Sequence, residues 1–126
     1  MSEPFDPKKF ISFISHNGKS ILYVDYSQCK DKWEMIQLLE ATVPHYRNAI
    51  GKVLTLSDYN NVTGSQEFMN VVKQLGKELF DAKTEKGAVL GITGLKKIFL
   101  QGYNLIAKQK IMAFDTKEQA LKYLTE

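Results

Sequence analysis

One short segment, Gly91-Ile-Thr-Gly-Leu-Lys-Lys97, combines glycines with lysines in a way that suits the binding of an anion. The apolar run from Ala88 to Leu90, continued by Ile92, predicts a buried strand that turns through the glycines into a helix. Amides at a helix start attract negative charge, and Thr93 is a suitable cap. A plain capped connection with solvated lysines explains the same residues, and short motifs favour that interpretation.

A second polar segment, residues 57–64, follows an apolar run centred on residues 53–56. That run predicts another strand, and ligands of α/β sheets bind at the carboxyl ends of parallel strands. The loops after the two strands should therefore converge, with Tyr26 and Tyr59 as walls beside them. The candidate residues for a ligand or a protein partner are Asp58, Asn60, Thr63, Ser65, Thr93, Gly94, Lys96 and Lys97.

The sequence contains no recognisable catalytic constellation. His16 belongs to a hairpin turn at the opposite end of the expected sheet, and His45 lies within a helix, so neither suits a Ser-His-Asp arrangement at the strand ends. The glycine segment is not a Walker A loop, because its lysines do not directly follow the second glycine. Asp25 and Asp58 could share Mg²⁺ only if the fold brought them together. We predict no catalytic residue, no metal and no cofactor, and an enzyme that uses Asp58 is the least favoured alternative.

The chain has a single cysteine, Cys29, so it cannot form an intrachain disulfide. Cys29 precedes a predicted helix, where the helix dipole and Lys30 would lower the pKa of its thiol. The favoured alternative is a small buried hydrophobic residue without a redox role. A lone cysteine fits a reducing, cytoplasmic setting.

Length and composition predict one soluble domain. The 126 residues are 44% hydrophobic and 25% charged, and the formal net charge is +3, which is too small to argue for nucleic acid. We expect a flexible arm at residues 1–8, where two prolines oppose regular structure, and one domain at residues 9–126. The first residues carry acids and prolines instead of a signal sequence, and no segment is long and apolar enough for stable membrane insertion.

Short β-rich runs and helical periodicities alternate in the order ββαβαβαβα. Asn17-Gly18 between the first two runs is a strong hairpin signal, because both residues tolerate the positive φ of a type I′ turn. Strands separated by helices need crossovers, which make parallel sheets with right-handed connections. We therefore predict an α/β fold with a five-stranded mixed sheet. The strands are expected near residues 10–15, 20–26, 52–59, 88–92 and 111–114, and the helices near 30–50, 65–83, 94–106 and 117–124.

Several details of the helices can be predicted as well. Pro44 should kink or split the first helix, and Gly102 in the third indicates close packing against a neighbour. Thr116 with Gln119 forms a capping box for the last helix. The expected buried stripe of the first helix is Trp33, Ile36, Leu39, Val43, Tyr46 and Ile50.

Three separate segments resemble the SpoIIAA-like group of bacterial proteins, also described as STAS/SEC14 domain-containing. They are the hairpin 13–26, the turn 91–97 and the ending 113–124. The resemblance covers nearly the whole domain and implies a small α/β sheet related in fold to anti-sigma-factor antagonists. It implies no established catalytic residues, and it carries a fold and not a function.

The resemblance also implies a role for Ser65. In the better-known antagonists a serine at the start of the helix after the third strand is phosphorylated, and Ser65 occupies the matching place, although Gly64 stands where those proteins have an aspartate. A phosphate there would lie at the positive end of a helix. The favoured alternative is that Ser65 is simply the helix cap.

Two functions follow as alternatives. The first is a non-enzymatic binding or regulatory module that docks a protein partner through the loops after the third and fourth strands. The second is a binder of a small anionic or lipid-like ligand at Thr93 to Lys97 and the helix that follows, in a shallow groove because so short a chain cannot easily enclose an acyl chain. We expect a monomer or a weak homodimer.

Overall fold

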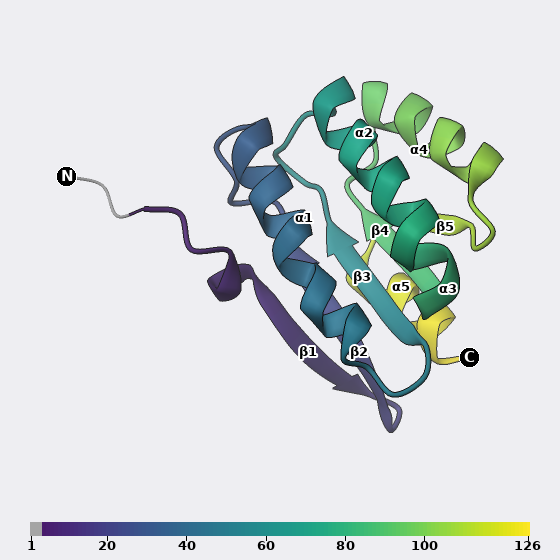
Figure 1. Cartoon of the computed structure of the whole chain (residues 1–126). Coiled ribbons are helices and arrows are strands. Elements are labelled where there is room, and N and C mark those ends of the chain that lie inside the picture. Colours follow the sequence, from purple (N-terminus) through teal and green to yellow (C-terminus); the bar gives the residue numbers. More distant parts are fainter. Residues whose placement is uncertain (1–3) are drawn as a thin grey trace.

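A computed structural model describes residues 4–126, which form one five-stranded mixed sheet covered by helices (Figure 1). The strand order is β1-β2-β3-β4-β5; β1 runs antiparallel to β2, and the other neighbours are parallel. The predicted fold class and element order are confirmed. The elements are η1 (Pro7–Phe10), β1 (Ile11–His16), β2 (Lys19–Asp25), α1 (Lys32–Arg47), β3 (Val53–Asp58), α2 (Gln66–Leu75), η2 (Gly76–Phe80), α3 (Asp81–Lys83), β4 (Thr84–Leu90), α4 (Leu95–Ile106), β5 (Ile111–Phe114) and α5 (Lys117–Thr125).

The β1–β2 hairpin turns at Asn17 and Gly18, as predicted. Their φ angles are 50° and 76°, the positive values that a type I′ turn requires at both central residues. The register pairs His16 with Lys19 across the two-residue loop. The sequence therefore determines this register locally, before any tertiary contact forms.

Helices cover the two faces of the sheet unequally. The strands follow chain order, and α1, α2 and α4 lie together on one face while α5 lies on the other (Figure 1). Because side chains alternate along a strand, β2 contributes Leu22 and Val24 to the core under α1 and α2, and Ile21 to the core under α5. Alternate residues of β2 thus belong to two separate cores.

Helix α1 continues through Pro44, so the predicted split near Thr42 is wrong. Asp31 caps the helix by accepting a hydrogen bond from the amide of Glu34 at 2.9 Å. Pro44 lies three residues before the last helical residue, Arg47, so its missing amide affects only the final turns of the helix.

The buried face of α1 also differs from the predicted stripe. Trp33 and Ile50 are exposed, and Ile50 is fully exposed at 105%. The buried residues are Met35, Leu38, Leu39, Thr42 and Tyr46. Apolar side chains occupy more than half of the circumference of α1, so periodicity alone does not fix the centre of its buried face.

The predicted helix 65–83 is continuous but contains a π-helical turn, η2, which the sequence did not indicate. The amide of Asp81 donates to the carbonyl of Gly76, five residues earlier. Gly76 is buried against α4, and a Cβ there would lie 2.9 Å from the hydroxyl oxygen of Tyr103. π turns occur mostly as single turns within α-helices, frequently at functional sites.

The two ends of the chain are anchored differently. Thr116 and Gln119 form the predicted capping box, and α5 buries Ala120, Leu121 and Leu124. In the predicted arm, residues 1–3 lie outside the described residues, η1 is capped by Asp6, and the ring of Phe5 stacks on Phe10 at 5.5 Å. Among the described helices, none has both the length and the apolar character to cross a membrane.

Gly102 and Gly18 both have open space around them but differ in backbone conformation. A Cβ at Gly102 in α4 would meet no atom within 4 Å, so the predicted close packing at Gly102 is wrong within this chain. We expect Gly102→Ala to raise the free energy of unfolding by about 0.5–1 kcal/mol, because alanine restricts the unfolded chain and favours the helix. The measurement is urea unfolding followed by circular dichroism.

Gly18→Ala is the matched control, since its Cβ would also meet open space but its φ is +76°. This change should lower the free energy of unfolding by about 1 kcal/mol, because alanine is strained in the left-handed region. Equal effects of the two substitutions would contradict the assignment of conformation at one of the positions.

Candidate functional site

The carboxyl ends of β2, β3 and β4 converge as expected, and hydrogen bonds join their loops. The amide of Tyr26 donates to the carbonyl of Asp58 at 2.9 Å, and that of Tyr59 donates to the carbonyl of Leu90 at 3.0 Å. The segments after β3 and β4 are joined a second time, because the Nζ of Lys96 donates to the carbonyl of Tyr59 at 2.8 Å. The loops after β3 and β4 therefore form one ordered rim.

Glycine is required twice where β4 turns into α4. Gly91 has φ +75°, and a Cβ there would lie 2.6 Å from the backbone nitrogen of Asn60. Gly94 is the N-cap of α4, with φ 55° and ψ −129°, a conformation that side chains disfavour. The close approach of Gly91 to Asn60 is what brings the two loops together.

Thr93 does not cap α4 with its hydroxyl, so that prediction is wrong. Its carbonyl accepts from the amide of Lys96 at 3.1 Å, and the carbonyl of Gly94 accepts from the amide of Lys97 at 3.0 Å. Gly94 takes the cap position because only glycine adopts its backbone angles readily. An anion at this turn would have to compete with these two bonds for the amides.

Side-chain alternation along β3 divides the candidate residues between the two faces of the sheet. Asp58 is in register with Asp25, on the same side as Leu54 and Leu56, which pack under α5. Burial, then Asp25 and Asp58, raise the pKa of the neighbouring Tyr23 to about 12. The side chain of Asp58 thus points to the α5 face, but its charge still acts on Lys96 of α4 and opposes the lowering of the Lys96 pKa by burial.

The carboxylate of Asp58 accepts hydrogen bonds within its own loop. It accepts from the amide of Asn60 at 2.9 Å and from the side-chain amide of Asn60 at 2.7 Å. Asp25 similarly accepts from the amide of Ser27 at 2.9 Å. Between residues 4 and 126, no group of three or more His, Cys, Asp or Glu side chains is placed to hold a metal ion.

On the other face, an apolar cavity of about 130 Å³ lies between the sheet and α1, α2, η2 and α4. Thr63 and Lys96, two of the sequence-predicted residues, line it at the rim. The aromatic side chains in its lining include Tyr26, Tyr46, Tyr59, Phe68, Phe99 and Tyr103. Among the predicted binding residues, Thr63 and Lys96 line this cavity, and the predicted walls Tyr26 and Tyr59 line it as well.

The tyrosines contribute ring surface and hydroxyl groups to the cavity lining. Tyr26 stacks on Tyr59 with ring centroids 4.6 Å apart, and Phe68 meets Tyr26 edge-on at 5.6 Å. Burial raises the pKa of Tyr26, Tyr46 and Tyr59 well above the ordinary value. These three hydroxyls are therefore neutral at physiological pH.

Burial, followed by the charge of Asp81, also raises the pKa of Tyr103 to about 12. In the described part of the chain, every buried side-chain nitrogen and oxygen has a hydrogen-bond partner. The cavity therefore presents apolar surface with polar groups that are already satisfied.

Two features that the sequence did not indicate shape this cavity. The π turn η2 ends at Phe80 and is followed by Asp81, and both residues line the cavity. The backbones of α1 and α2 pack closely, whereas α4 approaches no other described element to that extent (Figure 1). The apolar residues of α4 predict a packed helix but contain no signal for its distance from the sheet.

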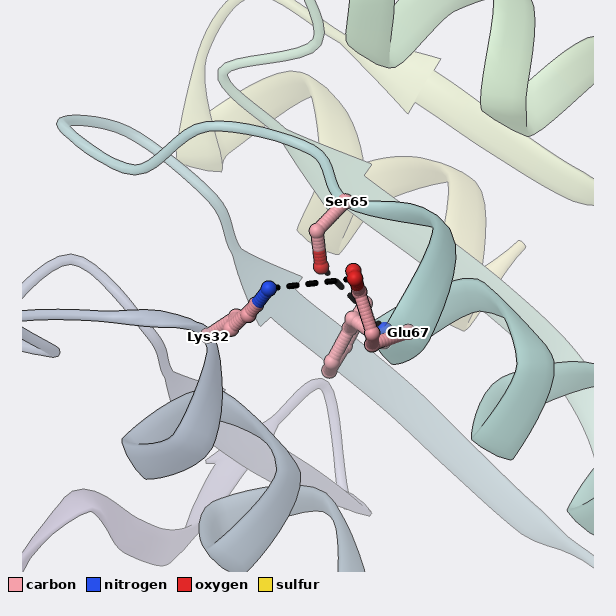
Figure 2. Close-up of polar contacts among 4 residues, drawn as sticks. Lys32, Ser65 and Glu67 are labelled. Carbon is pink, nitrogen blue, oxygen red and sulfur yellow. Dashed lines mark hydrogen bonds and ion pairs between the residues drawn. The ribbon is translucent and has the colours of Figure 1, made fainter.

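Ser65 caps α2, as the plainer interpretation predicted. Its Oγ accepts from the amide of Phe68 at 3.2 Å. Figure 2 shows Lys32, at the start of α1, reaching toward this helix start, where its Nζ lies 3.1 Å from a carboxylate oxygen of Glu67. A backbone amide and then Lys32 lower the pKa of Glu67. The predicted phospho-acceptor thus lies near a lysine that already has an acidic partner.

Cys29 is buried, with only 8% of its surface exposed, as its hydrophobic interpretation predicted. Burial first, and then the carboxylates of Glu34, Asp25 and Asp31, raise the pKa of its thiol to about 12. The predicted lowering by the helix start and Lys30 is wrong, because desolvation and these acids dominate. Cys29 therefore lacks the thiolate character that reactive cysteines need.

No protein-family model and no curated protein matches the sequence. A solved structure does match: an uncharacterised protein of the DUF3478 family with a SpoIIAA-like fold, from Shewanella loihica PV-4. The two chains are 19% identical, the match covers 90% of this chain and 91% of that chain, and the TM-score is 0.64. The fold is therefore SpoIIAA-like, as the resemblance implied, and at this identity the likeness extends to the fold alone.

The role of Ser65 as the cap of α2 can be tested by substitution. We expect Ser65→Ala to lower the free energy of unfolding by about 1 kcal/mol and Ser65→Asp to restore most of it, because aspartate caps helices as well as serine does. Thr63→Ala removes an exposed hydroxyl nearby and is the control, with little expected change. Unfolding curves measure all three, and a Ser65→Ala variant as stable as wild type would contradict the cap.

Proposed function

We propose that this protein is a non-enzymatic binding module that holds a small, largely apolar ligand in the cavity beneath α4. The observation that carries the proposal is the cavity itself, which is partly open to solvent, is lined mainly by aromatic and aliphatic side chains, and includes Thr63 and Lys96 in its lining. Such cavities with a few convergent polar groups are the usual form of small-molecule sites. Of the two functions that the sequence predicts, the geometry favours ligand binding.

The volume of the cavity limits the size of the ligand. An apolar cavity of about 150 Å³ accepts benzene in a well-studied engineered protein. At about 130 Å³, the cavity suits a molecule with one ring or a short branched chain. A complete lipid acyl chain would require α4 to move away from the sheet.

Lys96 gives the proposed ligand its polar end. Its Nζ is partly buried at the cavity rim, and burial lowers its pKa from the ordinary value. A carboxylate or another acceptor on the ligand could replace the carbonyl of Tyr59 as its partner. The proposed ligand is therefore a small amphipathic molecule with one anionic or hydrogen-bond-accepting end.

A binding role without catalysis is supported by the placement of the reactive side chains. The tyrosines of the cavity are neutral at physiological pH, as ordinary tyrosines are, and burial raises their pKa further. The thiol of Cys29 has a pKa raised to about 12. His45 packs edge-on against Phe13 at 5.6 Å, on the β1 side of the sheet. A cytoplasmic location is part of this proposal, because an unpaired thiol fits a reducing compartment.

The second candidate function is regulatory docking of a protein partner through the loops after β3 and β4, in the manner of STAS-type modules. The hydrogen bonds from Tyr59 to Leu90 and from Lys96 to Tyr59 favour it, because they hold both loops in one arrangement before any partner arrives. Asn60, Asn61 and Lys97 are exposed on this rim. Phosphorylation of Ser65 would belong to this candidate.

Thermal unfolding with single-ring compounds tests the ligand proposal. We expect benzoate or phenylacetate to raise the unfolding temperature by several degrees, because a ligand at ten times its Kd adds about 1.4 kcal/mol to the native state. Val72→Phe, which fills part of the cavity from α2, should abolish the shift. Lys96→Met should weaken the binding of benzoate and phenylacetate but not that of phenol or indole. Lys97→Met is the matched control, because Lys97 is an exposed neighbour of Lys96. The proposal fails if no compound stabilises the wild type, or if Val72→Phe responds as wild type does.

Variants of the rim separate the second candidate from the first. Asn61→Asp with Lys97→Glu changes the charge of exposed loop positions and leaves the cavity lining unaltered. If the rim docks a partner, we expect this double variant to lose at least tenfold in affinity for that partner while its thermal response to benzoate is unchanged. Isothermal titration measures the partner affinity, and thermal unfolding measures the response to benzoate. Unchanged partner affinity would remove the rim from the interface.

A further inference from the structure

The outer face of α4, away from the cavity, is unusually apolar. Leu95, Ile98, Leu105 and Ile106 are all more than half exposed, and Leu105 is exposed at 86%. Their spacing of three, seven and one residues places them in one stripe along the helix, with Gly102 among them. We call these four side chains the aliphatic stripe.

The inner face of the same helix is already occupied by the cavity. Phe99, Leu100 and Tyr103 line it, and together with the aliphatic stripe they make more than half of the circumference of α4 apolar, while Lys97, Gln101 and Asn104 form its polar side. A contiguous exposed apolar patch normally marks a contact with a partner or a membrane. Something in the cell is therefore expected to cover the aliphatic stripe.

The charge around the stripe indicates what covers it. From Gly91 to Phe114 the chain contains no aspartate or glutamate and four lysines, Lys96, Lys97, Lys108 and Lys110. Lys97, Lys108 and Lys110 are exposed at the two ends of α4. Two acids from other segments face these lysines: Asp81 accepts a hydrogen bond from the amide of Lys108 at 3.0 Å, and the charge of Asp58 acts on Lys96. The four lysines outnumber these two acids, so the surroundings of the stripe carry a net positive charge.

We infer that α4 docks flat on an anionic membrane surface, with the aliphatic stripe at the level of the headgroups and the lysines against lipid phosphates. Interfacial helices combine an apolar face with lysines in this way, and their binding grows with buried apolar area and with attraction to anionic lipid. The contact is peripheral, since α4 has 12 residues and spans about 18 Å, too short to cross a bilayer. It goes beyond the proposed ligand function and does not depend on a ligand in the cavity.

A second copy of the chain fits this surface less well. Antiparallel pairing of two α4 helices about Gly102 would bring Lys97 of one copy toward Lys108 of the other, and parallel pairing would align identical lysines. Like charges across such a pair are destabilising. An anionic bilayer satisfies all of these lysines at once and needs no complementary shape for a convex helix.

Vesicle sedimentation of the full chain tests the inference. We expect the protein to sediment with vesicles of phosphatidylcholine mixed with phosphatidylglycerol, to remain in solution with phosphatidylcholine alone, and to dissociate as salt is raised. Ile98→Ser with Leu105→Ser should weaken binding about tenfold or more. Lys97→Gln with Lys108→Gln should weaken it severalfold. Both pairs are exposed, and circular dichroism verifies that each variant is folded.

Ile50→Ser is the matched control, because Ile50 is a fully exposed aliphatic residue outside α4. It should sediment as wild type does. The inference is overturned if anionic vesicles do not bind the protein, or if the stripe variant binds as well as wild type. It is also overturned if ultracentrifugation finds a dimer that Leu105→Ser dissociates, or if an acidic amphipathic peptide binds α4 while vesicles do not.

Discussion

Parallel strands laid down in chain order force α1, α2 and α4 onto the same face of the sheet, because crossovers of one hand return on one side. Four parallel strands leave limited width for three helices, and the closest packing goes to α1 and α2. The last helix of the layer, α4, therefore lies over the β5 side (Figure 1). Both the cavity beneath α4 and the uncovered apolar surface above it follow from this one constraint.

The alternation of side chains in β3 decides which chemistry can act together at the rim. Residues 54, 56 and 58 point to the α5 face, and residues 55, 57 and 59 point to the helical layer. The carboxylate of Asp58 therefore accepts hydrogen bonds within its own loop on the α5 face, whereas the ammonium of Lys96 lies in the cavity lining and bonds to the carbonyl of Tyr59. Convergence of loops brings backbones together, but the strand period decides which side chains share a space.

Local signals were sufficient to predict much of the fold. Asn17-Gly18 requires positive φ, and the capping residues Ser65 and Thr116 act on amides only three residues away, so sequence alone determines them. The choice of buried face in α1, the π turn at Gly76 and the distance of α4 from the sheet depend on packing between distant segments. The cavity depends on the last two, and sequence reasoning found its rim residues Thr63 and Lys96 but not the space that they border.

The π turn η2 also determines how the helical layer responds to a change in chain length. A turn closed five residues apart holds one residue more than an α-helical turn, so losing one residue between Gly76 and Phe80 would restore regular α-helix. The residues after the turn would keep their orientation relative to α2, because the wider turn absorbs the extra residue without rotating the helix that follows. Evolution can therefore lengthen or shorten the chain by one residue at this position and leave the helices on either side in place.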